Sequence, residues 1–104
     1  QLNIQPKQIK IGGAVTLEVE LTNQSTRPQK LLVDYVVHYV RQGGKTSAKV
    51  FKWKQLEIPA KESAILKKRH SLKVTTVRAL YPGEHRIEVQ VNGVRVAEDC
   101  FELA

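Results

Sequence analysis

At 104 residues, 41% of them hydrophobic, the chain is long enough for one domain with a single core and too short for two. Its one cysteine, Cys100, excludes an internal disulfide and a cysteine-only zinc site, and no apolar run reaches the roughly 20 residues of a membrane-spanning helix. The net charge of +7 indicates a surface that attracts polyanions. Because the chain begins at Gln1 and has no methionine, we expect it to be a domain from the interior or C-terminus of a longer protein.

Alternation of apolar and polar residues predicts β-strands along most of the chain. Residues 15–21 alternate Val or Leu with Thr or Glu, which is the period of a half-buried strand. Residues 29–42 are apolar on both faces of the predicted strand and rich in β-branched and aromatic side chains, as in a central strand. Gly and Pro pairs separate the runs. The predicted strands cover residues near 3–11, 14–23, 30–41, 47–56, 63–74, 85–91 and 94–103.

The last two strands carry a hairpin signal. Asn92-Gly93 lies between alternating runs and predicts a type I′ turn, in which both central residues have positive φ. Val94 and Phe101 have opposite parity, so a β-bulge near residues 97–99 is expected to re-aim the final strand. At most a short turn is expected near residues 75–80.

Seven antiparallel strands in about a hundred residues predict an all-β fold, an immunoglobulin-like or fibronectin-like β-sandwich made by residues 1–104 as one domain. Burial must hold the two sheets together, because the inter-sheet disulfide of antibody domains is absent. A closed barrel is the structural alternative.

The positive charge is unevenly distributed. Residues 35–83 contain eleven cations and two acids, a charge of +9, whereas the remainder carries −2. Such an asymmetry attracts polyanions, and nucleic acid is the commonest one in a cytoplasm. The alternative is an ordinary solubilising surface.

Within the strand at 47–56, side-chain alternation separates aromatic residues from cations. Phe51 and Trp53 are expected on one side and Lys52 and Lys54 on the other. We therefore expect Trp53 to pack in the core rather than to stack on a base, which would require an exposed ring beside the cations.

If the strands at 47–56 and 63–74 belong to one sheet, their outward cations form a patch, fringed by cations near the 42–48 turn. Lys68 interrupts the apolar side of its strand and is expected to reach out at an edge. The candidate nucleic-acid-binding residues are Arg41, Lys45, Lys49, Lys52, Lys54, Lys67, Arg69 and Lys73.

Catalytic and metal-binding patterns are weak. Asp34 and His38 share a strand face but would lie about 13 Å apart, too far for a hydrogen bond. His70 and His85 fall on separate strands without metal-ligand spacing, and Cys100 lacks the cationic neighbours of an activated thiol. The sequence predicts no catalytic residue, no metal and no cofactor.

Four stretches, "QKLLVDYVVHYVRQGGKTSAKVFKWK", "KKRHSL", "LYPGEHRIEVQVNG" and the closing "FEL", carry a family resemblance. Over roughly residues 9–103 the chain resembles the C-terminal domain of bacterial HEAT-repeat DNA alkylation repair proteins, which are similar to alkylpurine DNA glycosylases. The resemblance implies a bacterial cytoplasmic protein in which this module follows a helical-repeat domain. The family's excision chemistry is placed on the helical repeats, so no catalytic residue transfers to this chain.

The main hypothesis is a non-catalytic accessory domain whose basic sheet face assists weak, sequence-independent binding of double-stranded DNA. The alternative is a protein-interaction module that docks on the helical repeats of the same chain or on a partner, without touching DNA. A third possibility is an extracellular adhesion or chaperone-type module, which would require a signal peptide upstream of Gln1.

Overall fold

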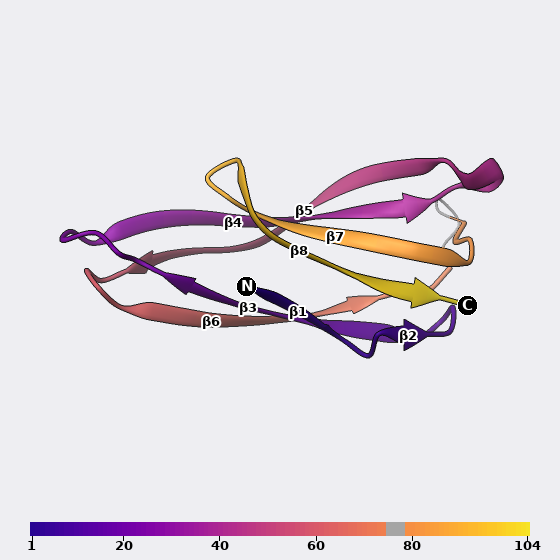
Figure 1. The fold of residues 1–104 in the computed structure, drawn as a ribbon, viewed down its shortest axis with the longest axis horizontal. Coiled ribbons are helices and arrows are strands. Elements are labelled where there is room, and N and C mark those ends of the chain that lie inside the picture. Colours follow the sequence, from indigo (N-terminus) through magenta and orange to yellow (C-terminus); the bar gives the residue numbers. More distant parts are fainter. Residues whose placement is uncertain (75–78) are drawn as a thin grey trace.

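The computed structural model describes residues 1–74 and 79–104 and consists of two β-sheets packed face to face as two layers (Figure 1). The three-stranded sheet has the order β1-β3-β6, and the five-stranded sheet has the order β2-β8-β7-β4-β5. The predicted immunoglobulin-like β-sandwich is therefore confirmed. The elements are β1 (Leu2–Gln5), β2 (Gln8–Ile9), β3 (Ala14–Thr22), β4 (Gln29–Val40), η1 (Gln42–Gly44), β5 (Thr46–Ile58), β6 (Ser63–Ser71), β7 (Gly83–Val91) and β8 (Val94–Leu103).

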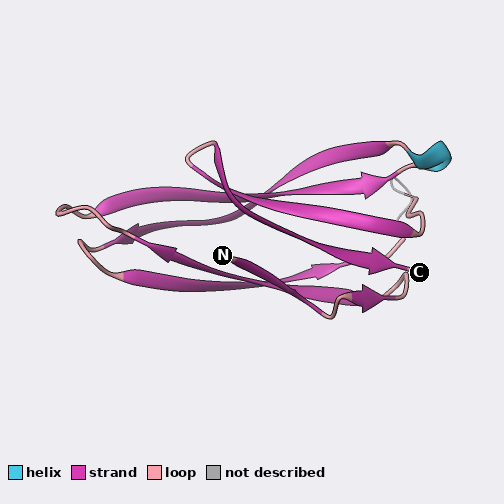
Figure 2. Ribbon diagram, in the orientation of Figure 1, coloured by secondary structure: helices cyan, strands magenta, loops and turns pink. Residues whose placement is uncertain are grey.

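Strands dominate the secondary structure of the described residues, which include one 3₁₀ turn, η1, at the tip between β4 and β5 (Figure 2). In the described part of the chain no helix is long and apolar enough to cross a membrane. The turn expected near residues 75–80 falls mainly on 75–78, which lie outside the described residues.

The single strand predicted at 3–11 is wrong, because the structure divides it between the two sheets. β1 pairs with β3, whereas β2 pairs in parallel with β8, Gln8 lying opposite Glu102. Pro6 lies between them and has no N–H with which to continue a ladder. Asp99 of β8 accepts a hydrogen bond from the backbone N–H of Ile4, 3.0 Å long, so β1 and β8 close this side of the sandwich.

The core lies between the sheets and includes a polar cluster around His70. Val15, Leu17 and Val19 of β3 are fully buried against the inward side chains of the other sheet. His70 of β6 is 6% exposed, and its two ring nitrogens lie 3.0 Å from the hydroxyl of Tyr35 and 3.1 Å from that of Tyr39. Since both tyrosines belong to β4, these contacts link the two sheets by hydrogen bonds in a fold without a disulfide.

The β7–β8 hairpin turns as its sequence predicts. Asn92 and Gly93 have φ of 51° and 82°, the positive values of a type I′ turn. Asn92 also continues the ladder of β4, because its N–H donates to the Leu32 carbonyl and its Oδ1 accepts the Leu32 N–H, both over 2.9 Å. The bulge predicted at 97–99 lies earlier, at Val96, where the pairing changes from Val89–Ala97 to Gln90–Arg95.

β5 and β6 do not share a sheet, so the condition under which their outward cations would form one patch is not met. β5 pairs with β4 through the short tip, whereas the chain crosses to the other layer after Ile58. The buried side chain of Asn23 fixes this crossing by donating to the carbonyls of Ile58 and Pro59. Each strand is the outermost of its own sheet, and the two meet along one side of the sandwich.

Candidate nucleic-acid interface

All eight candidate cations lie on the surface along the side formed by β5 and β6 or next to it. Within the described residues none of them forms an ion pair, whereas Lys7, Arg86 and Arg95 do. Their charge therefore remains open to solvent and to a ligand. The exposed candidates are Lys49, Lys52 and Lys54 on β5, Lys67 and Arg69 on β6, Lys73 after β6, and Arg41 and Lys45 on either side of η1.

A β-bulge at Trp53 changes which way the lysines of β5 point. Lys52 lies opposite Asp34 in β4, but Lys54 lies opposite Val33, which leaves Trp53 as the extra residue. Val33 is 1% exposed and faces the core, so Lys54 belongs to the core-facing side of the strand and Lys52 to the outer side. The prediction that Lys52 and Lys54 share one face is therefore wrong.

Cations and aromatic rings share the core-facing side of β5. The Lys49 ammonium lies 5.1 Å from the centroid of the Phe51 ring, a cation–π contact. The ring of Phe51 also stacks on that of Tyr35, with 5.1 Å between the ring centroids. The expectation that the aromatic residues would be separated from every cation is wrong, because Lys49 has the same parity as Phe51.

Trp53 contacts the core without being enclosed by it. Its ring meets Tyr35 edge to face at 5.7 Å, and its side chain is half-buried. The predicted core position is thus only partly correct, since β5 is the outermost strand and nothing in its own sheet covers its free edge.

Lys68 of β6 is a further cation that the candidate set omits. It lies opposite the fully buried Leu17, in the core-facing row of its strand, yet it is exposed. As predicted, this lysine reaches out at the edge of the sheet. The rings of Phe51 and His70 lie 5.0 Å apart, which brings the core-facing rows of β5 and β6 together. We call Lys49, Phe51, Trp53, Lys54 and Lys68 the lateral strip.

Carboxylates compensate part of the charge on the outer faces. Lys52 lies directly across from Asp34, and Lys67 lies across from Glu18. Opposite charges at such positions attract each other. In the lateral strip the cross-strand partners of Lys49, Lys54 and Lys68 are the apolar residues Val37, Val33 and Leu17. The three lysines of the lateral strip therefore lie directly across from apolar residues rather than from carboxylates.

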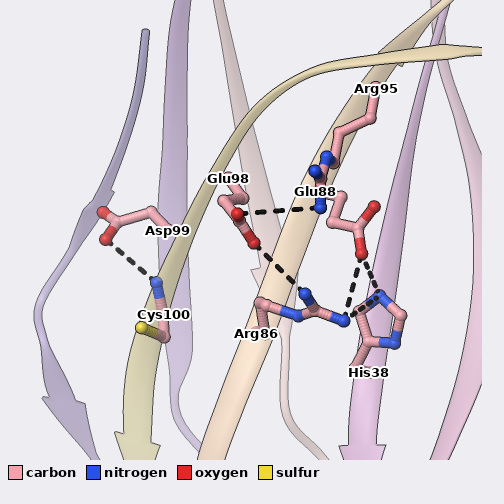
Figure 3. Close-up of polar contacts among 7 residues, drawn as sticks. All are labelled: His38, Arg86, Glu88, Arg95, Glu98, Asp99 and Cys100. Carbon is pink, nitrogen blue, oxygen red and sulfur yellow. Dashed lines mark hydrogen bonds and ion pairs between the residues drawn. The ribbon is translucent and has the colours of Figure 1, made fainter.

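The outer face of the five-stranded sheet is acidic over β7 and β8. Glu88 lies across from Glu98, and Arg86 bridges the two with contacts of 3.2 and 3.3 Å (Figure 3). His38 joins the same network through a 2.6 Å contact with Glu88, so its partner is Glu88 rather than Asp34 (Figure 3). Glu84 and Glu102 form a second acidic cross-strand pair. The domain therefore has a basic side and an acidic face.

The remaining histidines and the cysteine do not assemble into a reactive group. His85 is fully buried; its Nδ1 donates to the Gly83 carbonyl and its Nε2 accepts from the Val40 N–H. Burial, together with the nearby Glu84, raises the pKa of the Cys100 thiol, which disfavours the nucleophilic thiolate. Among the described residues no three His, Cys, Asp or Glu side chains gather as metal ligands would.

The two-layer topology and the basic side define an immunoglobulin-like module with polarised charge. Residues 1–104 match the family described as "Uncharacterised protein YhaZ, C-terminal Ig-like domain", and the chain belongs to this family. The resemblance stated from the sequence is confirmed by this match and by those that follow.

Two longer proteins contain a similar module. The chain is 35% identical over 92 residues to the uncharacterized protein YhaZ of Bacillus subtilis (strain 168), covering 88% of this chain and 25% of YhaZ. It also matches Pseudomonas fluorescens alkylpurine DNA glycosylase AlkC, solved bound to DNA containing an abasic site analog. That match has a TM-score of 0.96 and 36% identity, and covers 99% of this chain and 29% of AlkC. The chain thus spans less than a third of either protein.

Other solved structures share the fold alone. A β-glucosidase from Listeria innocua matches the whole chain with a TM-score of 0.78 and 17% identity, over 16% of its own length. The β-glucosidase EmGH1 from Erythrobacter marinus has a TM-score of 0.83 and 11% identity.

Proposed function

We propose that this domain is a non-catalytic, C-terminal accessory module of a bacterial, cytoplasmic DNA alkylation repair-type protein, and that its basic side contacts the backbone of double-stranded DNA. The observation that carries the proposal is the set of exposed cations on β5 and β6 that form no ion pair in the described part of the chain. The similarity to a glycosylase solved with DNA supports the same function. Any excision chemistry belongs to another domain of the longer protein.

Lysines suit this function because phosphate contacts position a protein on DNA without reading its sequence. Each neutralised phosphate also releases condensed counterions, which makes binding favourable at low salt. The sandwich is 48 Å long, so a side of this length could follow about 14 base pairs at 3.4 Å each. The acidic face of β7 and β8 would be repelled by DNA, which favours an approach by the β5–β6 side.

A charge-matched pair of variants tests the proposal. Lys49→Glu, Lys54→Glu and Lys68→Glu together reverse the cations of the lateral strip. The control makes the same change in net charge at Lys10, Arg27 and Lys30, which lie outside the strip. Binding is measured by fluorescence anisotropy with a labelled 20-base-pair duplex in low salt. Relative to the unmodified chain, the strip variant is expected to bind at least tenfold more weakly and the control less than threefold more weakly.

Two results would contradict this function. Equal losses in both variants would mean that only net charge matters, and undetectable binding by the unmodified chain would remove DNA contact altogether. Circular dichroism of both variants must first show unchanged strand content.

The alternative function is docking on a protein, and the acidic face gives it a surface. Glu84 and Glu102 lie directly across from each other and form no ion pair within the described ranges. Like charges at such positions destabilise a sheet unless a cation joins them, and a basic surface of the longer protein or of a partner could supply that cation. This alternative is favoured if the strip variant leaves the DNA affinity of the full-length protein unchanged.

A further inference from the structure

A second basic feature lies at the end of the sandwich that carries η1 and the C-terminus (Figure 2). An open pocket of about 430 Å³ is present there. It is separate from the lateral strip, because none of the strip residues lines it. Its lining residues are Arg41, Gln42, Lys45, Ala79 and Tyr81.

The turn between β4 and β5 brings the two cations of this pocket together. The Arg41 N–H donates to the Lys45 carbonyl over 2.6 Å, and the Gly44 N–H donates to the Arg41 carbonyl over 3.3 Å. Gly43 and Gly44 have φ of 81° and 80°, the left-handed conformation that other residues adopt at a cost. A Cβ at either glycine would meet no atom of the described residues within 4 Å, so backbone conformation rather than space requires glycine here.

The side chains around the pocket are suited to an anion. Arg41 contributes a guanidinium, Lys45 an ammonium, Gln42 an amide and Tyr81 a hydroxyl, all of which can donate hydrogen bonds. Among the described residues, no carboxylate lines the pocket. Neither Arg41 nor Lys45 forms an ion pair with any residue that the structure describes. Several donors of positive charge facing one space match the acceptor oxygens of a phosphate group.

The size of the pocket favours a phosphate that is part of a larger molecule. The pocket falls within the roughly 300–1,000 Å³ range of small-molecule sites, which exceeds the need of a bare phosphate ion. Ala79, with its small side chain, leaves room beside the cations, and the half-buried Tyr81 provides an aromatic wall. A sugar phosphate unit therefore fits the chemistry better than an isolated ion.

We propose that this tip pocket binds one phosphate group of nucleic acid through Arg41 and Lys45, with Gln42 and Tyr81 as additional donors. The inference rests on the proposed function and adds a defined contact at one end of the domain to the extended contact of the lateral strip. Such a contact fixes where a DNA strand lies relative to the domain, which an array of flexible lysines alone does not do.

Nuclear magnetic resonance titrations of the chain test the inference through the amide signals of Gly43 and Gly44. The probes are inorganic phosphate, a 12-base-pair duplex with 5′-phosphates and the same duplex without them, each against sodium chloride of equal ionic strength. Saturable shifts are expected at the tip with inorganic phosphate and with at least one duplex. A shift with both duplexes identifies a backbone phosphodiester as the ligand, and a shift with the phosphorylated duplex alone identifies a terminal phosphate.

Variants separate this inference from the proposed function. Arg41→Gln with Lys45→Gln should weaken the affinity of the tip for inorganic phosphate, measured from the amide shifts, at least tenfold. Arg41→Lys keeps the positive charge but loses the planar guanidinium, and should give an affinity between those of the unmodified chain and the double variant. The lateral strip variant should keep the response at the tip to inorganic phosphate.

If no probe shifts the tip signals while the duplex binds through the strip, the tip site is wrong and the proposed function stands. If inorganic phosphate shifts the tip and no duplex binds, the proposed function fails, and with it the assignment of the site to nucleic acid.

Discussion

The hydroxyl of Tyr35 lies 3.0 Å from Nδ1 of His70, and this contact joins β4 of the five-stranded sheet to β6 of the three-stranded sheet. The two rings also meet edge to face at 5.5 Å. Because both groups are buried, the hydrogen bond is shielded from water, and losing one partner leaves the other without a substitute from solvent. Part of the attachment between the sheets is therefore polar.

Tyr35→Phe should destabilise the domain by about 1–2 kcal/mol, because it removes the hydroxyl and retains the ring. The free energy of unfolding in urea measures this change. Tyr81→Phe, at the rim of the tip pocket, is the matched control and should change the free energy by less than about 0.5 kcal/mol. Equal effects at the two positions would show that the inter-sheet hydrogen bond contributes nothing of its own.

The same tyrosine predicts a loss of stability at alkaline pH. Burial, with a further contribution from the nearby Tyr39, raises the pKa of Tyr35 from 10.0 to about 12. The folded state thus holds its proton at pH values where the unfolded chain has lost it, so this stabilisation is complete below about pH 10 and disappears as the pH rises through about 12. Urea unfolding at several pH values between 9 and 12 should show that the free energy of unfolding falls more steeply with pH for the unmodified chain than for Tyr35→Phe. Parallel curves would refute the assignment of this pH dependence to Tyr35.

Asp99 should stabilise the closed side of the sandwich. Partial burial acts to raise the pKa of Asp99, but the hydrogen bonds from Lys7 and from the N–H groups of Cys100 and Ile4 outweigh it, and the pKa is lowered. Asp99→Ala leaves the Ile4 N–H without this acceptor and should cost about 1–3 kcal/mol at pH 7.

The pH dependence of this variant has a definite sign. A lowered folded pKa stabilises above the unfolded value near 3.9, and the stabilisation is lost as the pH falls through the folded value. The difference in unfolding free energy between the unmodified chain and Asp99→Ala should therefore shrink between pH 5 and pH 2. A difference that stays constant over this range would contradict the role of the carboxylate.

Trp53→Ala should cost about 2 kcal/mol, since a buried Phe or Trp loses about 3–5 kcal/mol and this ring is half-buried. Leu17→Ala, at a fully buried position opposite Lys68, should cost about 2–5 kcal/mol and serves as the reference. Urea unfolding of both variants compares them directly. A cost below about 0.5 kcal/mol for Trp53 would mean that its ring makes no stabilising contact with Tyr35.

Salt dependence should count the phosphate contacts. Four contacts give a slope of about −3.6 in log K against log salt, and removing the three lysines of the lateral strip should reduce it to about −0.9. Anisotropy titrations between 25 and 200 mM salt provide both slopes. An unchanged slope with lower affinity would indicate that these lysines do not contact phosphates.

Features that depend on neighbouring residues could be predicted from the sequence. The strands followed from alternation, and the hairpin turn followed from Asn92-Gly93, because both signals act over a few residues. The exposure of Lys68 followed from the presence of a lysine in an apolar row.

Features that depend on pairing between distant segments could not be predicted. The bulge at Trp53 exists only relative to β4, and it moves Lys54 to the side opposite Lys52 without any local sequence signal. The crossing that separates β5 from β6 is hydrogen-bonded by Asn23, which is remote in sequence from it. The sequence correctly predicted that the candidate cations are exposed. Assigning each of them to the lateral strip, an outer face or the tip requires knowing which residues pair across the strands.

The position of β5 and β6 as the outermost strands has a consequence for solubility. A free strand edge invites pairing with another copy of the chain, and lysines along such an edge oppose that pairing by repulsion. The lysines proposed to meet DNA would therefore also oppose edge-to-edge pairing of unbound copies. Replacing them by alanine would remove both effects together, so a loss of DNA binding in such a variant has to be separated from self-association by light scattering.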